Sequence, residues 1–104
     1  MKLLSIEYVP GQEIDALGLV KGTIVQTKNV GRDIMAGMKT LVGGEISGYT
    51  QMLNEARQIA TKRMVDEAKE LGADAIIGIT YGSSQVMSGA AEVVAYGTAV
   101  KYKN

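Results

Sequence analysis

Residues 43–50, with the sequence GGEISGYT, are the first candidate for chemistry, because they approach the pattern of a phosphate-binding loop. That pattern, G-x-x-x-x-G-K-[ST], follows a strand and uses its lysine to reach the phosphates. Gly43 and Gly48 fit it, but Tyr49 stands where the lysine should be. The residues before Gly43 also have helical spacing. We therefore expect a connection between two helices, although N–H groups at a helix start can still hold an anion.

Arg57 is the charged side chain whose position most needs an explanation. On a helical wheel it falls within an apolar stripe that includes Met64, and a guanidinium there needs a carboxylate or carbonyl partner. One interpretation is an arginine that binds a small anion. The favoured one is a structural ion pair at an interface, with Asp33 of the same or a neighbouring chain as the partner. On the other flank of the stripe, Arg63 can reach Glu67 one turn later.

Methionines are the possible ligands for a soft metal ion. Met35 and Met38 lie one turn apart, and Met52 and Met64 fall in the next predicted helix. Thioethers bind Cu(I), but such sites usually add thiolate or imidazole, and the chain contains no cysteine and no histidine. Methionines that fill irregular core space are favoured, so we predict no metal-ligating residue and no cofactor.

Acid–base catalysis would need convergent side chains in a pocket. The carboxylates of Glu45, Glu55, Asp74 and Glu92 show no spacing that brings them together. Histidine, the commonest general base, and cysteine, a common nucleophile, are absent. We therefore predict no catalytic residue and expect a protein that is not an enzyme.

Length and charge restrict the class of protein further. The 104 residues are expected to form one domain, residues 1–104. Lysine plus arginine equal aspartate plus glutamate, at 11 each, so the basic excess typical of nucleic-acid or anionic membrane partners is missing. The sequence contains no run of about 18 apolar residues, which is the length needed to span a membrane. Ser5 and Glu7 interrupt the first apolar stretch too early for a signal peptide, so we expect a cytoplasmic protein.

Hydrophobic periodicity and turn residues predict six elements in the order β-β-α-α-β-β. They are strands at 2–8 and 13–28, helices at 30–42 and 47–71, and strands at 73–82 and 90–102. The segment SSQVMSG between the last two strands carries no helix signal, so that pair should be a hairpin. Because the helices are segregated in the middle, the order is typical of an α+β fold with an antiparallel sheet and two central helices.

Both faces of the predicted strands are apolar, whereas strands of a sheet covered on one side should alternate apolar and polar residues. The opposed sets are Val93, Ala95 and Ala99 against Val94, Tyr96 and Val100, and Leu17, Leu19 and Val25 against Ala16, Val20 and Ile24. Strict alternation also places Ala75, Ile77, Ile79 and Tyr81 on one face and Ile76 on the other. One long helix can cover one face, so a second copy of the chain is expected to cover the other. The alternative is a monomer whose short helix folds across it.

Several segments in this order resemble the YbjQ-like family, which carries the label of a heavy-metal-binding domain. They are LGLVKGTIV (17–25), NVGRDIMAGMKTLVGG (29–44), YTQMLNEARQIA (49–60), EAKELGADAIIGITY (67–81) and YGTAVK (96–101). The resemblance implies a dodecin-like subunit in a ring-shaped homopentamer and no established reaction. It gives as assembly or ligand candidates Asn29, Arg32, Asp33, Gly43, Gly44, Tyr49 and Arg57.

The expected function is therefore that of a non-catalytic, cytoplasmic homo-oligomer, pentameric by resemblance, with a small ligand or ion at subunit interfaces. A heavy-metal-binding protein is the alternative. An enzyme acting on an anionic small molecule near Arg57 is the third hypothesis. The expected partner is the chain itself.

Overall fold

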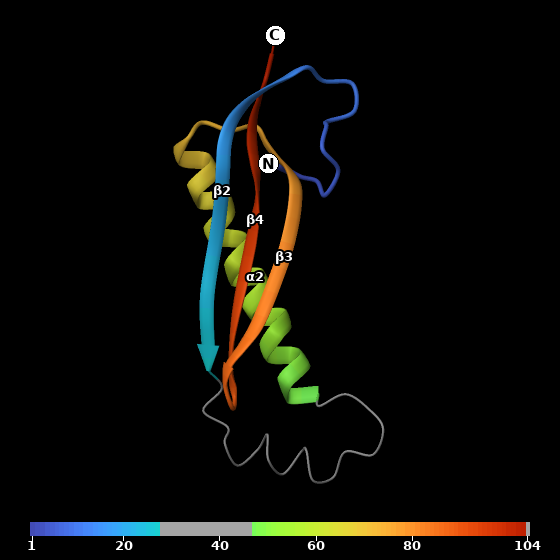
Figure 1. Cartoon of the computed structure of the whole chain (residues 1–104). Helices are drawn as coiled ribbons and strands as arrows, with labels where there is room; N and C mark the ends of the chain where they lie inside the picture. The colour runs from blue at the N-terminus through green and yellow to red at the C-terminus, as the bar shows by residue number, and fades with distance from the viewer. Residues whose placement is uncertain (28–46, 104) are drawn as a thin grey trace.

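The computed structural model of the chain describes residues 1–27 and 47–103. Within them lie strands β1 (Lys2–Leu3) and β2 (Ile14–Thr27), helix α2 (Ser47–Glu70), and strands β3 (Ala75–Met87) and β4 (Ala90–Tyr102) (Figure 1). The long early strand, the long helix and the final hairpin are confirmed, and the fold is α+β. The third predicted strand was too short, because β3 continues to Met87 through residues expected to form the connection. The predicted helix at 30–42 lies outside the described residues.

The four strands form one mixed sheet in the order β1-β3-β4-β2. β4 is the central strand and pairs antiparallel with both long neighbours. Its register with β2 runs from Ile14 opposite Tyr102 to Thr27 opposite Ala90. Long antiparallel ladders of this kind satisfy the backbone of β4 on both sides, so this strand can lie in the core.

The prediction of a first strand over residues 2–8 in an antiparallel sheet is wrong. The strand is short, Lys2–Leu3, and runs parallel to β3, with Lys2 opposite Ala75. Backbone bonds extend this contact, since the Leu4 N–H donates to the Ile76 carbonyl and the Gly78 N–H to that of Ile6. β2 takes the far edge of the sheet beside β4, so the N-terminal residues pair at the β3 edge instead.

Helix α2 crosses one face of the sheet and packs its apolar stripe into the main core cluster (Figure 1). The fully buried residues of this stripe recur at every fourth position of the helix, which is close to the repeat of a single helical face. The fully buried members are Met52, Ala56, Ala60, Met64 and Ala68. Leu71, which the stripe also included, is 48% exposed because it follows the last helical residue.

The small side chains of α2 let its backbone approach β2 closely at Gly22. A Cβ atom on Gly22 would overlap the Ala60 carbonyl oxygen and approach the Met64 backbone nitrogen. This glycine therefore lets the helix backbone approach the strand. Glycine is required at this position because no side chain fits between the two elements.

A register shift in β3 reverses the faces predicted for its second half. Gly78 has a φ of 61°, and the pairing with β4 shifts between Ile77 and Thr80. Ile77 therefore stays on the face away from α2, whereas Ile79 packs with Ile76 against the helix. The predicted alternation was wrong here because a bulge adds a residue to one strand, and only the pairing with β4 reveals it.

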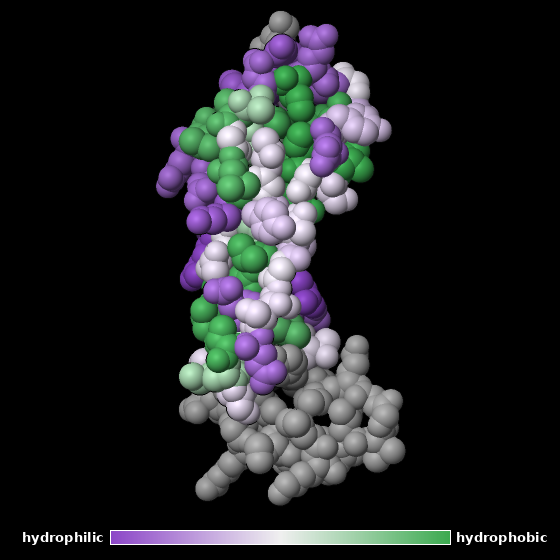
Figure 2. Space-filling model, viewed as in Figure 1, coloured by the Kyte–Doolittle hydropathy of each residue, from purple (hydrophilic) through white to green (hydrophobic). Residues whose placement is uncertain are grey.

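The sheet face opposite α2 is covered at one end only by described residues. There Val9, in the segment between β1 and β2, packs against Ile77 and Val100. Further along, Leu19 is 69%, Val25 55% and Tyr96 41% exposed. Figure 2 shows this face, where hydrophobic and polar residues alternate along the exposed strands.

Two side chains of α2 occupy the outer edge of β2. The Glu67 carboxylate accepts from the Lys21 backbone N–H at 3.2 Å, and an Arg63 guanidinium nitrogen donates to the Thr23 carbonyl at 2.7 Å. The predicted contact between Arg63 and Glu67 is thus replaced by two contacts to the strand. An unpaired strand edge invites pairing with another chain, and these contacts satisfy part of it.

Candidate functional site

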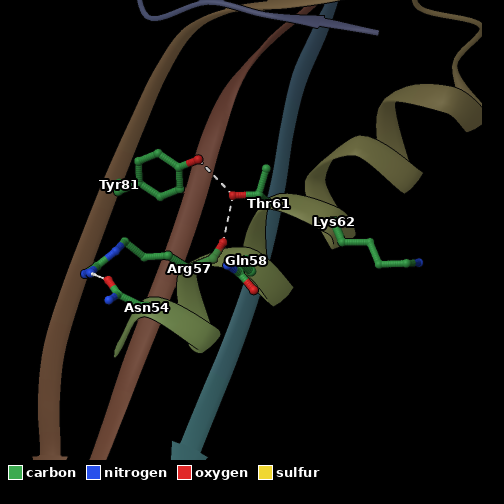
Figure 3. Close-up of a pocket in the computed structure, with 6 residues that line it drawn as sticks. All are labelled: Asn54, Arg57, Gln58, Thr61, Lys62 and Tyr81. Atoms are coloured by element: carbon green, nitrogen blue, oxygen red, sulfur yellow. Dashed lines mark hydrogen bonds between the residues drawn. The ribbon is translucent and has the colours of Figure 1, made fainter. Parts of the chain in front are cut away.

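The candidate site is a groove of about 660 Å³ between α2 and β3 (Figure 3). Each of its lining residues carries a polar group, and they come from one face of the helix and one strand position: Asn54, Arg57, Gln58, Thr61, Lys62 and Tyr81. A smaller hollow of about 180 Å³ adjoins it, with Gly82, Ser83 and Val93 in its wall. Arg57 and Tyr81 line both hollows. Ligand pockets commonly combine such a concave surface with a few convergent polar groups.

The packing of α2 creates this groove. The helix contacts the sheet mainly through alanines that meet β2 and β4, including Ala60 beside Gly22 and Ala56 in the same cluster. The second half of β3 lies beyond that contact, and Tyr81 extends from it toward the helix (Figure 3). The phenol thus bridges a gap that helix side chains leave open.

A chain of hydrogen bonds fixes the phenol of Tyr81. Thr61 Oγ1 donates to the Arg57 carbonyl at 2.7 Å and lies 2.8 Å from the Tyr81 hydroxyl. A carbonyl oxygen can only accept, so the single hydroxyl proton of Thr61 is used on Arg57. The Tyr81 hydroxyl must therefore donate to Thr61, and its oxygen presents an acceptor to the groove.

The Arg57 guanidinium faces the groove and donates to the Asn54 side-chain oxygen. Its side chain is half-buried. Among the described residues no carboxylate lies within ion-pair distance of it, and its expected partner Asp33 lies outside them. A guanidinium has five N–H donors, so most of these donors remain available for a partner other than Asn54.

Lys62 contributes little positive charge to the groove. Its ammonium lies 2.9 Å from the Asp66 carboxylate, one turn along the exposed side of α2, and points away from Arg57 (Figure 3). The hydrogen bond from Lys62 is the main cause that lowers the pKa of Asp66 below its ordinary value, with smaller contributions from the charges of Lys62 and Lys69. The groove thus has one unneutralised cation among its described lining residues.

The other carboxylates that the structure describes lie apart and form no catalytic or metal-binding cluster. Asp74 accepts from the Tyr102 backbone N–H at 2.8 Å and lies 3.8 Å from Lys101 Nζ, which makes it a clamp between β4 and the start of β3. Glu55 accepts from Gln51 on the same helix. In the described part of the chain, no three acidic residues converge at a distance suited to a metal ion.

Of the predicted site residues, the structure places Arg57 in the groove. Tyr49 falls in the first turn of α2, with its side chain outside the described part, where the remaining candidates also lie: Asn29, Arg32, Asp33, Gly43 and Gly44. Sequence reasoning missed Tyr81 and Thr61, which are the neighbours of Arg57 in the groove. Thr61 follows Arg57 by one helical turn, which is a usable signal, but nothing local links either residue to a strand twenty positions later.

The fold and the groove together define a class: small α+β domains in which one helix crosses one face of a four-stranded mixed sheet. Within that class the chain belongs to the YbjQ-like family, since the family model described as "Putative heavy-metal-binding" matches residues 1–103.

Relatives from several bacteria match almost the whole chain. A UPF0145 protein of Clostridium novyi is 58% identical over 101 residues, covering 97% of this chain and 98% of the relative. One from Helicobacter hepaticus is 62% identical over 101 residues, with 97% of each chain covered. One from Thermotoga maritima is 59% identical over 102 residues, covering 97% and 96%.

A solved structure has the same fold. It belongs to a protein with unknown function from Pediococcus pentosaceus, of the DUF74 family, and superimposes with a TM-score of 0.65 at 20% identity. The match covers 99% of this chain and 98% of that one. At this identity the likeness shows the fold alone.

Within the described residues, no helix combines the length and apolar character needed to cross a membrane.

The donor set of this chain does not fit the family's heavy-metal description. Soft metals select thiolate, imidazole or several thioethers, and the chain has no cysteine and no histidine. Of the described methionines, Met52 and Met64 are fully buried in the core against the sheet, while Met1 and Met87 are exposed at its ends. We derive no metal chemistry for the groove.

Proposed function

We propose that this chain is a non-catalytic cytoplasmic protein that works as a homo-oligomer, a ring of five copies, and binds a small ligand. The observation that carries the proposal is the sheet face opposite α2, where Leu19, Val25 and Tyr96 are exposed on neighbouring strands. Exposed apolar side chains gathered on one face of a sheet are the kind of surface that a partner covers. A second copy of the chain is the partner that the family resemblance implies, and the number five rests on that resemblance.

The edges of the sheet support the proposal by indicating how copies could meet. From Thr80 onward, β3 pairs with β4 on one side, and no described residue pairs with its outer edge. The middle of the β2 edge is occupied by Arg63 and Glu67. A contact through the exposed face, extended by the open edge of β3, is therefore the arrangement that the described residues favour.

The non-catalytic part of the proposal is supported by the chemistry of the groove. Tyr81 donates its hydroxyl proton to Thr61, which itself donates to a backbone carbonyl. This chain of bonds ends on the backbone and contains hydroxyl groups alone. The described lining residues can bind and orient a ligand, and they supply no general base or nucleophile with an activating partner.

Mass measurement in solution tests the assembly. We expect about five times the mass of one chain at micromolar concentration, and a smaller species for the double variant Leu19→Ser with Val25→Thr, which removes apolar surface from the exposed face. The matched control is Gln58→Ala with Glu70→Ala, on the exposed side of α2, which should keep the mass of the unmodified protein. A wild-type monomer at that concentration would contradict the proposal.

A further inference from the structure

The geometry points to a binding site for a small organic carboxylate in the groove between α2 and β3, held by Arg57 and positioned by Tyr81. This inference assigns a chemical class to the ligand of the proposed function. It rests on the ligand-binding part of that proposal alone. The described site is formed within one chain, so it does not depend on the number of subunits.

The charge of the groove selects a ligand with one negative charge. Among the described lining residues, Arg57 is the cation that faces it, while Lys62 is paired with Asp66 and points away. A phosphate group carries nearly two charges at neutral pH and is usually met by more than one cation. A single guanidinium matches a carboxylate, which it can bind through two parallel N–H···O bonds.

The groove orients the guanidinium before any ligand arrives. Arg57 is half-buried and donates to Asn54, one turn earlier on α2. Because the Asn54 oxygen accepts this bond, its amide nitrogen retains two donors beside the same hollow. Immobilising an arginine in advance reduces the entropy lost on binding, so even one charged contact can give measurable affinity.

Tyr81 adds a preference among carboxylates. Its hydroxyl proton is committed to Thr61 at 2.8 Å, so the phenol oxygen can only accept from the ligand. A carboxylic acid with a hydroxyl or ammonium group near its carboxylate would satisfy both Arg57 and Tyr81. A plain alkyl carboxylate of similar size would satisfy Arg57 alone.

Lactate and propionate test this difference, because they share a charge and differ by one hydroxyl. In calorimetric titrations of the full chain, we expect lactate to bind with a Kd of about 1 mM and propionate about threefold more weakly. Phosphate should bind more weakly than lactate. No heat from lactate up to about 10 mM, or tighter binding of phosphate, would overturn the inference.

Variants assign the binding to residues. Arg57→Gln should weaken lactate binding by at least about tenfold, whereas Lys62→Gln, the matched control in the same groove, should change it by less than about twofold. Tyr81→Phe should remove the preference for lactate over propionate and leave propionate binding intact. Unchanged lactate binding in Arg57→Gln would overturn the assignment.

A measurement on the unmodified protein covers the case in which Arg57→Gln does not fold. The chain has three arginines, so their side-chain Nε–H signals can be assigned individually by NMR. Lactate should shift the Arg57 signal while leaving that of Arg63, which is bonded to β2, in place. Equal shifts of both signals would mean unspecific binding and would refute the site. The oligomeric mass, measured on the same samples, tests the proposed assembly separately.

Discussion

Gly22 in β2 passes beneath the carbonyl oxygen of Ala60 in α2 so closely that no side chain can stand between them. This contact sets the distance between the helix and the sheet. Because α2 lies so near β2 and β4, the gap that remains open is on the β3 side, where Arg57 and Tyr81 line the groove. The position of the candidate site thus follows from a glycine in another strand.

Gly22→Ala should destabilise the protein by about 3 kcal/mol, because the added Cβ must displace helix backbone rather than a flexible side chain. Denaturant unfolding at one fixed protein concentration measures it, since an oligomer's apparent stability depends on concentration. Gly82→Ala is the matched control. Its Cβ would lie 3.4 Å from Val94 Cγ1, an ordinary contact, so the change should stay below about 1 kcal/mol. Equal losses in both variants would contradict this explanation.

Tyr81→Phe removes the phenol's hydrogen bond to Thr61. Tyr81 is 46% exposed, so water replaces part of the interaction and the loss should be about 0.5 kcal/mol. A double-mutant cycle with Thr61→Val should show coupling of about 0.5 kcal/mol between the two positions. If the two losses simply add, the hydrogen bond makes no net contribution, and the orientation of Tyr81 has another cause.

The double variant Arg63→Ala with Glu67→Ala should increase self-association. It exposes the Lys21 N–H and the Thr23 carbonyl at the edge of β2, and unsatisfied edge groups pair with other chains. Light scattering during incubation at neutral pH would detect the larger species. Gln58→Ala with Glu70→Ala alters two exposed residues of the same helix and should leave the scattering unchanged. No increase for the first variant would show that its two contacts do not protect the edge.

The Asp66 carboxylate predicts a small effect of acid. Its pKa is lowered chiefly by the hydrogen bond from Lys62, so the pair stabilises the folded state above the ordinary pKa of about 4 and loses that contribution as the pH falls through the lowered value. A carboxyl-carbon NMR titration should show the pKa of Asp66 below the ordinary value of an aspartate. In Lys62→Gln its pKa should return to the ordinary range. An unchanged pKa in that variant would show that Lys62 is not the cause of the lowering.

The same pair makes a prediction for the groove. Asp66→Asn leaves the Lys62 ammonium without its partner, on a side chain that lines the groove. Lactate binding should then strengthen by about twofold at low salt, and the gain should disappear at high salt because exposed charges are screened. Titrations at two salt concentrations measure it. Weaker binding in this variant would indicate that Asp66 itself supports the site.

Sequence reasoning predicted the elements whose signals are local. The helix predicted at 47–71 is confirmed as α2, whose exposed face carries Asn54, Glu55, Gln58, Lys62, Asp66 and Lys69. The opposed faces of β4, and those of β2 from Leu19 onward, were also predicted correctly because regular strands alternate. Ala16 was placed on the wrong face, since a register shift between Ala16 and Gly18 interrupts the alternation in β2. The ends of α2 were marked by Ser47 and Gly72.

The errors occurred where a distant segment decided the local structure. Residues 2–8 look like a strand in isolation. Because β2 lies at the far edge of the sheet, only Lys2 and Leu3 of this segment form a strand, and they pair with β3. In β3, alternation fails at Gly78, because the bulge is defined only by the pairing with β4. The groove was missed for the same reason, since Tyr81 and Thr61 have no relationship along the chain.

The sequence by itself therefore determined that this is an α+β chain with a long helix, a long early strand and a final hairpin. It also determined that thiolate and imidazole chemistry is absent. The tertiary structure decided that β1 is parallel, that α2 approaches β2 at Gly22, and that Arg57 and Tyr81 share one hollow. The physical reason is range: periodicity and turn residues act over a few positions, whereas packing distance depends on side chains far apart in the chain.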